Sequence, residues 1–199
     1  MEWREKKTRS KTQKKTVKQM EKDLKDEINH RLDEWHKEKK EITHKKETVN
    51  KDDLGKVKFD IMPWTIWWFT AGENIGRELG SHVHDDQSFN FRRPCIIISK
   101  LQSLYDTDHS IVTILPMSTK SDGIGLHKKF IHKLEASNYP KDYDDSKFHR
   151  GLKKDSFVVC HQMKTIDTKR LLSQVTTRIM DKDVTAIKQK MYKYLDLEE

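Results

Sequence analysis

The sequence of 199 residues predicts a mainly β (α+β) domain that ends in a helix and is preceded by one long, charged α-helix. Three observations predict this fold class. All glycines and prolines lie beyond position 54, so residues 1–53 contain neither helix breaker. Short apolar runs bounded by polar clusters follow, as expected for buried strands. A helical apolar period returns near the C-terminus. We therefore divide the chain into a helical or coiled-coil extension, residues 1–53, and a domain, residues 54–199.

The first helix has a narrow apolar stripe. Its apolar residues recur at steps of three, four or seven, at Val17, Met20, Leu24, Ile28, Leu32, Trp35, Ile42 and Val49. Several acids precede a base by four residues, the better order for an exposed helix, as in Glu21 and Lys25. The steps average near 3.6 and not a strict 3.5, which supports a long left-handed coiled coil only in part.

The remaining elements are short. We expect strands at Ile61–Phe69, Pro94–Ser99, Ile111–Met117 and Phe157–His161, with a weaker candidate at residues 128–134. Asp181 or Asp183 is expected to cap a final helix, whose apolar positions are Val184, Ile187, Met191, Tyr194 and Leu195.

Composition excludes some classes of protein. No run approaches the roughly 18 apolar residues of a membrane span, and no apolar segment follows the charged N-terminus as in a signal peptide. Cys95 and Cys160 lie in apolar runs without metal-ligand spacing, which argues against a disulfide framework or a zinc site and suits a reducing cytoplasm. The net charge of +8 is compatible with a polyanionic partner but also with an ordinary solvated surface.

Four polar places could supply phosphate chemistry on RNA, which needs cations, a hydroxyl or imidazole, and an open groove. They are GENIGRE (72–78), the Arg92-Arg93-Pro94 triplet, PMSTKS (116–121) and the His161-Gln162 pair with MKTID after it. Each also has an ordinary explanation: the arginines as surface ion-pair partners, the hydroxyls as turn caps, and His161 as a satisfied, half-buried histidine.

The order of these four pieces resembles the MazF/PemK (Kid-like) family of bacterial toxin ribonucleases. The resemblance runs from about Trp64 to Leu195, and its most specific stretch is DSFVVCHQMKTIDTKRL, residues 155–171. It implies a small β-barrel of the Src-homology-3-like CcdB/PemK/MazF type with a C-terminal helix. It also implies a cytoplasmic homodimer that cleaves single-stranded RNA without a metal or other cofactor and is inhibited by a cognate antitoxin.

The resemblance also implies roles for individual residues. Arg93 falls on the family's catalytic arginine before proline, and Ser118 falls on its catalytic threonine or serine. Substrate-binding or orienting positions are expected at Arg77, Glu78, Arg92, Thr119, Lys120, Gln162 and Lys164.

The chain departs from the family where many members have a carboxylate before the glutamine, because it has His161 there. A side chain that titrates near neutrality could act as the acid or base, so we expect His161 to be catalytic. The loop between Leu79 and Phe91 and the 121–154 segment are longer than usual, which predicts a different sequence preference.

Two other functions remain open at this point: a non-enzymatic, CcdB-like toxin that binds DNA gyrase, and an inactive nucleic-acid-binding module. Cleavage of RNA would use Arg93 and Ser118, whereas gyrase binding would not. The first helix is expected to be a solvated spacer, a coiled-coil arm of a dimer, an antitoxin-docking element, or a basic tip that gathers RNA.

Overall fold

The computed structural model describes two compact units, Met1–Lys40 and Glu41–Glu199. The described residues are 2–44, 61–73, 78–79, 82–83, 89–102, 110–119, 128–139, 151–176 and 178–197. Side chains are described in these ranges except at 2–15, 82–83, 89–90, 100–102 and 110. The expected division between residues 53 and 54 lies outside the described residues.

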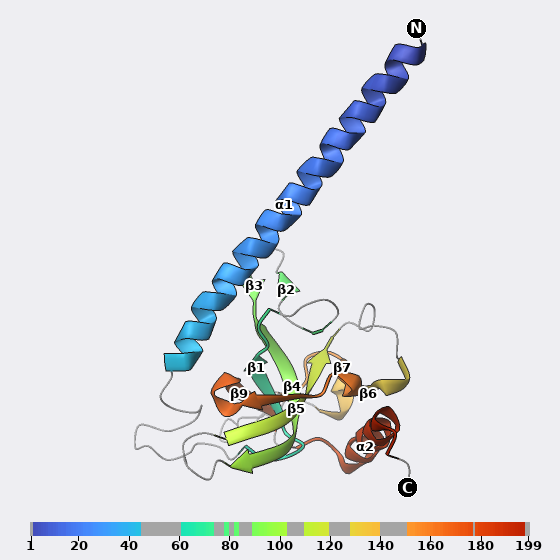
Figure 1. The fold of residues 1–199 in the computed structure, drawn as a ribbon. Coiled ribbons are helices and arrows are strands. Elements are labelled where there is room, and N and C mark those ends of the chain that lie inside the picture. Colours follow the sequence, from blue (N-terminus) through green and yellow to red (C-terminus); the bar gives the residue numbers. More distant parts are fainter. Residues whose placement is uncertain are drawn as a thin grey trace. The chain divides into compact units, whose positions relative to one another are not determined.

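Helix α1 (Glu2–His44) is one continuous element (Figure 1). The absence of glycine and proline explains its length, because nothing in these 43 residues interrupts the backbone hydrogen bonding. Pairs along the helix support it, since Gln19 Nε2 donates to Asp23 Oδ1 at 2.7 Å and Lys37 Nζ donates to Glu34 Oε1 at 2.6 Å. The last residue of the expected stripe, Val49, lies outside the described residues. No helix in the described part of the chain is long and apolar enough to cross a membrane.

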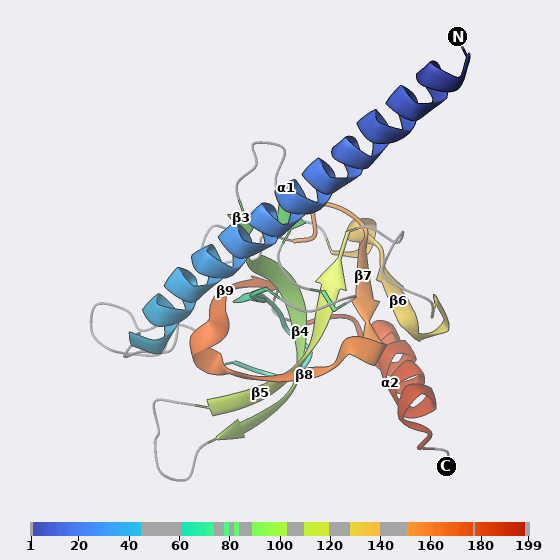
Figure 2. The same ribbon diagram turned by 45° about the horizontal axis from the view of Figure 1, so that its top comes forward.

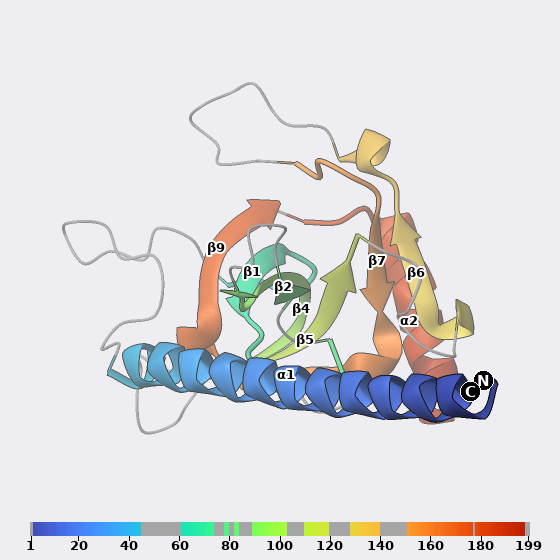
Figure 3. The same ribbon diagram turned by 90° about the horizontal axis from the view of Figure 1, so that it is seen from above.

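The second unit is built on an antiparallel sheet, which confirms the predicted fold class. Its strands run in the order β6-β7-β5-β4-β1-β9, and β8 also pairs with β5 (Figures 2 and 3). A small separate sheet pairs β2 with β3. The strands are β1 (Ile66–Thr70), β2 (His82–Val83), β3 (Phe89–Asn90), β4 (Arg92–Gln102), β5 (Ser110–Ser118), β6 (Ile131–Leu134), β7 (Ser156–Val159), β8 (Lys164–Asp167) and β9 (Leu171–Thr176).

Two hydrophobic cores lie on the two faces of β1, β4 and β5. One contains Trp67, Phe69, Cys95, Ile97 and Ile114; the other contains Ile66, Ile96, Leu115, Val158 and Ile187. Successive strand residues point to opposite faces, so the continuous apolar runs are those of strands buried on both sides.

Strand β1 begins later than the sequence predicts. The expected strand started at Ile61, but β1 starts at Ile66. Trp64 has a φ of 67°, in the left-handed region that a bulky residue rarely adopts. The carbonyl of Trp64 accepts a hydrogen bond from the Ile179 amide at 2.8 Å, which ties this turn to the segment before the last helix.

Helix α2 (Asp181–Leu195) packs beside β6 and the Lys128–Phe130 3₁₀ turn. The expected capping by Asp181 or Asp183 is wrong, because Met180 is the N-cap residue and no side chain caps it. Asp183 lies inside the first turn and is buried. It accepts hydrogen bonds from Tyr139 Oη at 2.5 Å and contacts His132 Nε2 at 2.7 Å. The Asp183 carboxylate is therefore occupied by these contacts and does not cap the N-terminus of α2.

Candidate functional site

Arg93 and Ser118 lie at the same end of two neighbouring strands. In the β4/β5 ladder Cys95 is paired with Pro116. The pairing of the two strands ends there, and Arg93 and Ser118 each lie two residues beyond that pair. Residues two apart share a face, so Arg93 follows the buried Cys95 along β4 and Ser118 follows Ile114 and Pro116 along β5. The two residues that the sequence analysis expected to be catalytic therefore lie on the same face and at the same end of the β4/β5 pair.

Arg93 is partly withdrawn from water. On the neighbouring strand β1 it is paired with Phe69, which is fully buried. The burial of Arg93 itself lowers the pKa of its guanidinium below the ordinary value. An arginine keeps its proton at neutral pH even so. The site thus holds a permanent positive charge in a partly dry environment, where it attracts an anion more strongly than it would in water.

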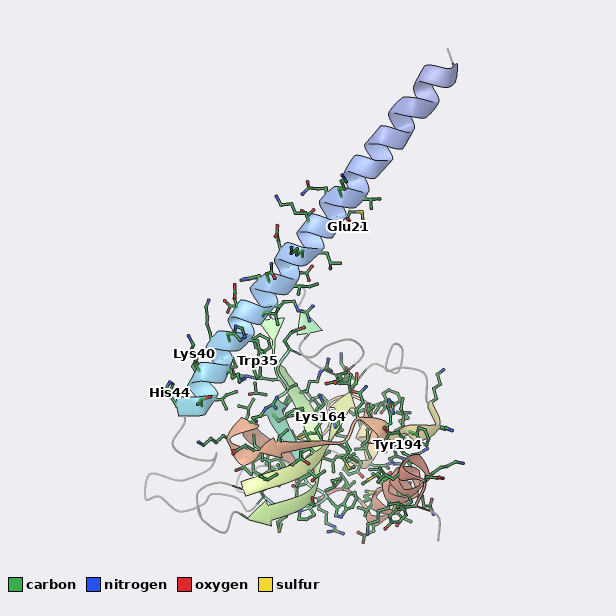
Figure 4. All side chains as sticks on the ribbon, in the orientation of Figure 1. Glu21, Trp35, Lys40, His44, Lys164 and Tyr194 are labelled. Atoms are coloured by element: carbon green, nitrogen blue, oxygen red, sulfur yellow. The ribbon has the colours of Figure 1, made fainter. Side chains whose placement is uncertain are left out.

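Lys164 brings a second positive charge to this group. It lies on β8 opposite Ile114 of β5 and is half-buried; Figure 4 labels it on the sheet. Its Nζ atom is 3.5 Å from Glu78 Oε2. Burial lowers the pKa of Lys164, and the charges of Arg170 and Arg93 lower it further, whereas Glu78 opposes the change. Both arginines are therefore close enough to Lys164 to affect its pKa.

Arg170, the third cation, was not among the expected site residues. Its Nε donates to the Thr70 carbonyl at 2.9 Å and its Nη2 donates to the Ala71 carbonyl at 2.6 Å, at the end of β1. Burial lowers its pKa as well. Its neighbour Lys169 has the same charge, so the local sequence did not show which of the two points toward Arg93 and Lys164.

Gln162 joins the site to the segment that carries Glu78. The Leu79 amide donates a hydrogen bond to Gln162 Oε1 at 2.7 Å, between the β7–β8 connection and residues 78–79. Glu78 itself is exposed and contacts Lys164. Arg77 and Lys120, also expected in the site, lie outside the described residues.

Arg92 and Thr119 lie one residue away from Arg93 and Ser118 and line a pocket of about 560 Å³. Its apolar wall includes Trp68, Pro94 and Leu152, of which Trp68 and Leu152 pack against the core that contains Ile96. Lys153 and Lys154, which the sequence analysis did not single out, contribute two more cations. The pocket therefore combines an apolar wall with a basic margin, separate from the face that carries Arg93.

His161 has aromatic neighbours. It belongs to the 3₁₀ turn Cys160–Gln162, because β7 ends at Val159, and the expected strand Phe157–His161 was two residues too long. The His161 ring lies 6.4 Å from the Phe130 ring and 6.2 Å from the Tyr194 ring, centroid to centroid. Tyr194 is on α2, and Figure 4 labels it there. These contacts place His161 on the α2 side of the domain, and its catalytic role stays a prediction.

Within the described residues, no group of three or more His, Cys, Asp or Glu side chains is arranged to hold a metal ion.

Comparison with protein families finds one match over most of the chain. The model described as PemK-like, MazF-like toxin of type II toxin-antitoxin system matches residues 62–195. A comparison with curated proteins finds no match.

Solved structures similar to the chain include a Mycobacterium tuberculosis toxin MazF-mt6, with 20% sequence identity and a TM-score of 0.39, covering 61% of this chain and 100% of that chain. Another, described as a crystal structure of Mtb toxin, has 20% identity and a TM-score of 0.36, covering 51% of this chain and 91% of that chain.

Proposed function

We propose that this chain, which belongs to the PemK-like, MazF-like toxin family of type II toxin-antitoxin systems, is an endoribonuclease that cleaves single-stranded RNA without a metal ion. The observation that carries this proposal is the half-buried Arg93 at the same end of the β4/β5 pair as Ser118, with Lys164 near enough to Arg93 and Arg170 for their charges to lower its pKa. Such a group is suited to an anion that gains charge during the reaction.

The proposed reaction is an internal transesterification. The 2′-oxygen forms a bond to the adjacent phosphorus, and the bond from phosphorus to the 5′-oxygen breaks. The products are a cyclic 2′,3′-phosphate and a free 5′-hydroxyl, so one proton leaves the 2′-hydroxyl and one proton is delivered to the 5′-oxygen. No water is consumed in this step.

Arg93 would bind the non-bridging oxygens through its planar fork of N–H donors, which fits a phosphate in two places at once. Its partial burial strengthens this contact as negative charge develops. Ser118, across the ladder, would donate its hydroxyl proton in a hydrogen bond to the same phosphate. Lys164 adds a further charge, and Arg170 supports the end of β1 beside them.

We further propose that His161 exchanges a proton with the substrate, since it stands where related sequences have a carboxylate. Replacing it in the His161→Ala variant should slow cleavage by about 100-fold or more, the usual contribution of a general acid or base. The His161→Phe variant, which keeps a ring but cannot exchange a proton, controls for loss of ring packing against Phe130 and Tyr194. We expect it to be as slow as His161→Ala. Cleavage at the wild-type rate by either variant would remove His161 from the mechanism.

As a member of a type II toxin family, the chain is expected to have an antitoxin partner, and we propose a homodimeric assembly. The decisive test of the function is incubation of the purified full chain with a mixed-sequence, single-stranded RNA in the presence of a chelator. We expect fragments that carry cyclic phosphate ends. No cleavage by the wild-type chain would contradict the proposal and favour a non-enzymatic, binding role. Equal cleavage by Arg93→Ala would also contradict it, because the cleavage would then not depend on Arg93.

A further inference from the structure

Helix α1 has an apolar stripe that is exposed to solvent. The side chains of Val17, Met20, Leu24, Ile28 and Leu32 are 54%, 65%, 58%, 45% and 40% exposed. Scattered exposed apolar residues are ordinary, but five that follow one face of one helix form a continuous strip. An exposed strip of this kind on a long, otherwise charged helix is the usual contact surface of a helix pair.

The stripe keeps to one face because its steps fit the period of a straight α-helix. The 18 residues from Val17 to Trp35 make five turns at about 3.6 residues per turn. Two such stripes can therefore meet along their length with little supercoiling.

The charges beside the stripe differ in sign between its two flanks. Each residue advances by about 100° around the helix axis, which places each charged side chain relative to the stripe. One flank is basic, with Lys18, Lys22, Lys25 and Lys40; the other is acidic, with Asp23, Glu27, Glu34, Glu38 and Glu41. Between residues 17 and 44, Glu21 on the basic flank and Arg31 and Lys37 on the acidic flank are exceptions.

This arrangement selects an orientation for a partner with the same sequence. In a parallel, in-register pair related by a twofold axis along the helices, the basic flank of each helix faces the acidic flank of the other. In an antiparallel pair, like flanks face each other, so lysines meet lysines and carboxylates meet carboxylates. Charges flanking an apolar seam set the partner and the orientation of helix pairs.

From the exposed stripe and the two flanks of opposite charge, we infer that α1 pairs in parallel with α1 of a second copy of this chain. The pairing joins two toxin chains through their N-terminal extensions, outside residues 62–195 that match the family. It does not depend on the proposed nuclease activity, since it uses no residue of the candidate site.

Disulfide cross-linking of the full chain tests both the pairing and its orientation. The native cysteines, Cys95 and Cys160, are buried, and burial raises the pKa of both thiols, so neither should react. We would introduce Val17→Cys and Ile28→Cys separately. These positions share the stripe and are about 16 Å apart along the helix.

A parallel, in-register pair brings each of the two positions next to its own copy, so both variants should form disulfide-linked dimers under mild oxidation. In an antiparallel pair, at most one of the two positions can lie next to the same position of the second copy. A dimer from only one variant, or from neither, would overturn the parallel pairing.

The role of the stripe is tested in the Val17→Cys background. Adding Leu24→Glu and Ile28→Glu should abolish the cross-linked band, because two carboxylates would be buried in the seam. The matched control, Asn29→Glu with His44→Glu, adds the same charge at exposed positions of α1 away from the stripe and should keep the band. Circular dichroism verifies that both remain helical, since glutamate is a good helix former. A band that persists with Leu24→Glu and Ile28→Glu, or that is lost in the control, would overturn the inference.

Discussion

Arg92 and Arg93 are consecutive residues on β4, but the structure gives them different surroundings. Arg93 lies at the same end of the β4/β5 pair as Ser118, and burial lowers the pKa of its guanidinium. Arg92 is exposed and lines the pocket with Lys153 and Lys154. Ser118, at the end of β5, and Thr119, the next residue, differ in the same way. Ser118 shares the face of Arg93, whereas Thr119 lines the pocket. Two neighbouring side chains of the same charge are therefore placed for different tasks.

The difference shows what burial contributes to a cation. A half-buried guanidinium exerts a strong, directed attraction on a single phosphate, whereas an exposed cation contributes mainly to the long-range field and is screened by salt. We expect the Arg93 face to act on the reacting phosphate and the Arg92 face to bind flanking nucleotides. The predictions below compare matched variants of the two faces.

The largest contrast is expected between the two arginines. Arg93→Ala should lower kcat for RNA cleavage by about 100- to 1000-fold, the cost of removing one preorganised donor to a developing charge. Arg92→Ala should change kcat less than about 10-fold, with its effect mainly in KM. Steady-state cleavage of one fluorescent RNA by both variants measures the difference. Equal losses of kcat in the two variants would show that the two faces do not have different roles in cleavage.

A smaller contrast is expected between the two hydroxyls. Ser118→Ala removes a hydrogen bond to a charged group, which is worth about 10- to 100-fold in rate. Thr119→Ala, one residue further on, should stay near the wild-type rate because its side chain lines the pocket. Single-turnover cleavage compares them, and Ser118→Thr is expected to restore most of the activity. A Thr119→Ala defect larger than that of Ser118→Ala would reverse the assignment.

We expect RNA binding to depend on pH through Lys164 but not through Arg92. The pKa of Lys164 is lowered below the usual 10.5 by burial, Arg170 and Arg93. The binding form is the ammonium, so binding that needs its charge should be complete below the folded-state pKa and should be lost as the pH rises through it, earlier than for an ordinary lysine. The Lys164→Arg variant should lose this dependence, because arginine stays protonated.

Binding of a non-cleavable, 2′-O-methyl oligonucleotide of adenine and cytosine measures this effect, since these bases do not lose protons in the alkaline range. We expect about a 10-fold loss of wild-type affinity across the transition. The same alkaline loss in Lys164→Arg would contradict the assignment.

The smallest effect is expected on the pocket side. Lys153→Gln and Lys154→Gln should each weaken RNA binding only a few-fold, and each should reduce the slope of log K against log salt concentration by about 1. Binding titrations at several salt concentrations give that slope. Lys169→Gln, on the Thr168–Arg170 3₁₀ turn and not among the residues that line the pocket, serves as a control of equal charge. An unchanged slope in both pocket variants would show that this margin does not contact phosphates.

Much of the fold follows from the local pattern. The breaker-free, charged N-terminal segment is helical as far as the chain is described, and the branched and aromatic runs around Phe69, Ile97 and Leu115 form strands. These patterns report local propensity and the period of burial, which neighbouring residues largely determine. Boundaries were less accurate where a long-range contact intervened. Trp64 turns before β1, and Asp183 is held by Tyr139 and His132 and does not cap α2.

The sequence by itself determined which residue types can do phosphate chemistry, because Arg93, Ser118 and Lys164 occur in an ordered set of motifs. Only the tertiary structure decided which of them meet. The register of β4 on β5 places Arg93 and Ser118 at the same end of that pair. The pairing of β8 with β5 places Lys164 opposite Ile114, where the charges of Arg170 and Arg93 lower its pKa. Strand register is a non-local property, and a shift of one residue would exchange the faces of Arg92 and Arg93. The residues of the site can therefore be predicted from the sequence, whereas their geometry depends on contacts between residues far apart in the chain.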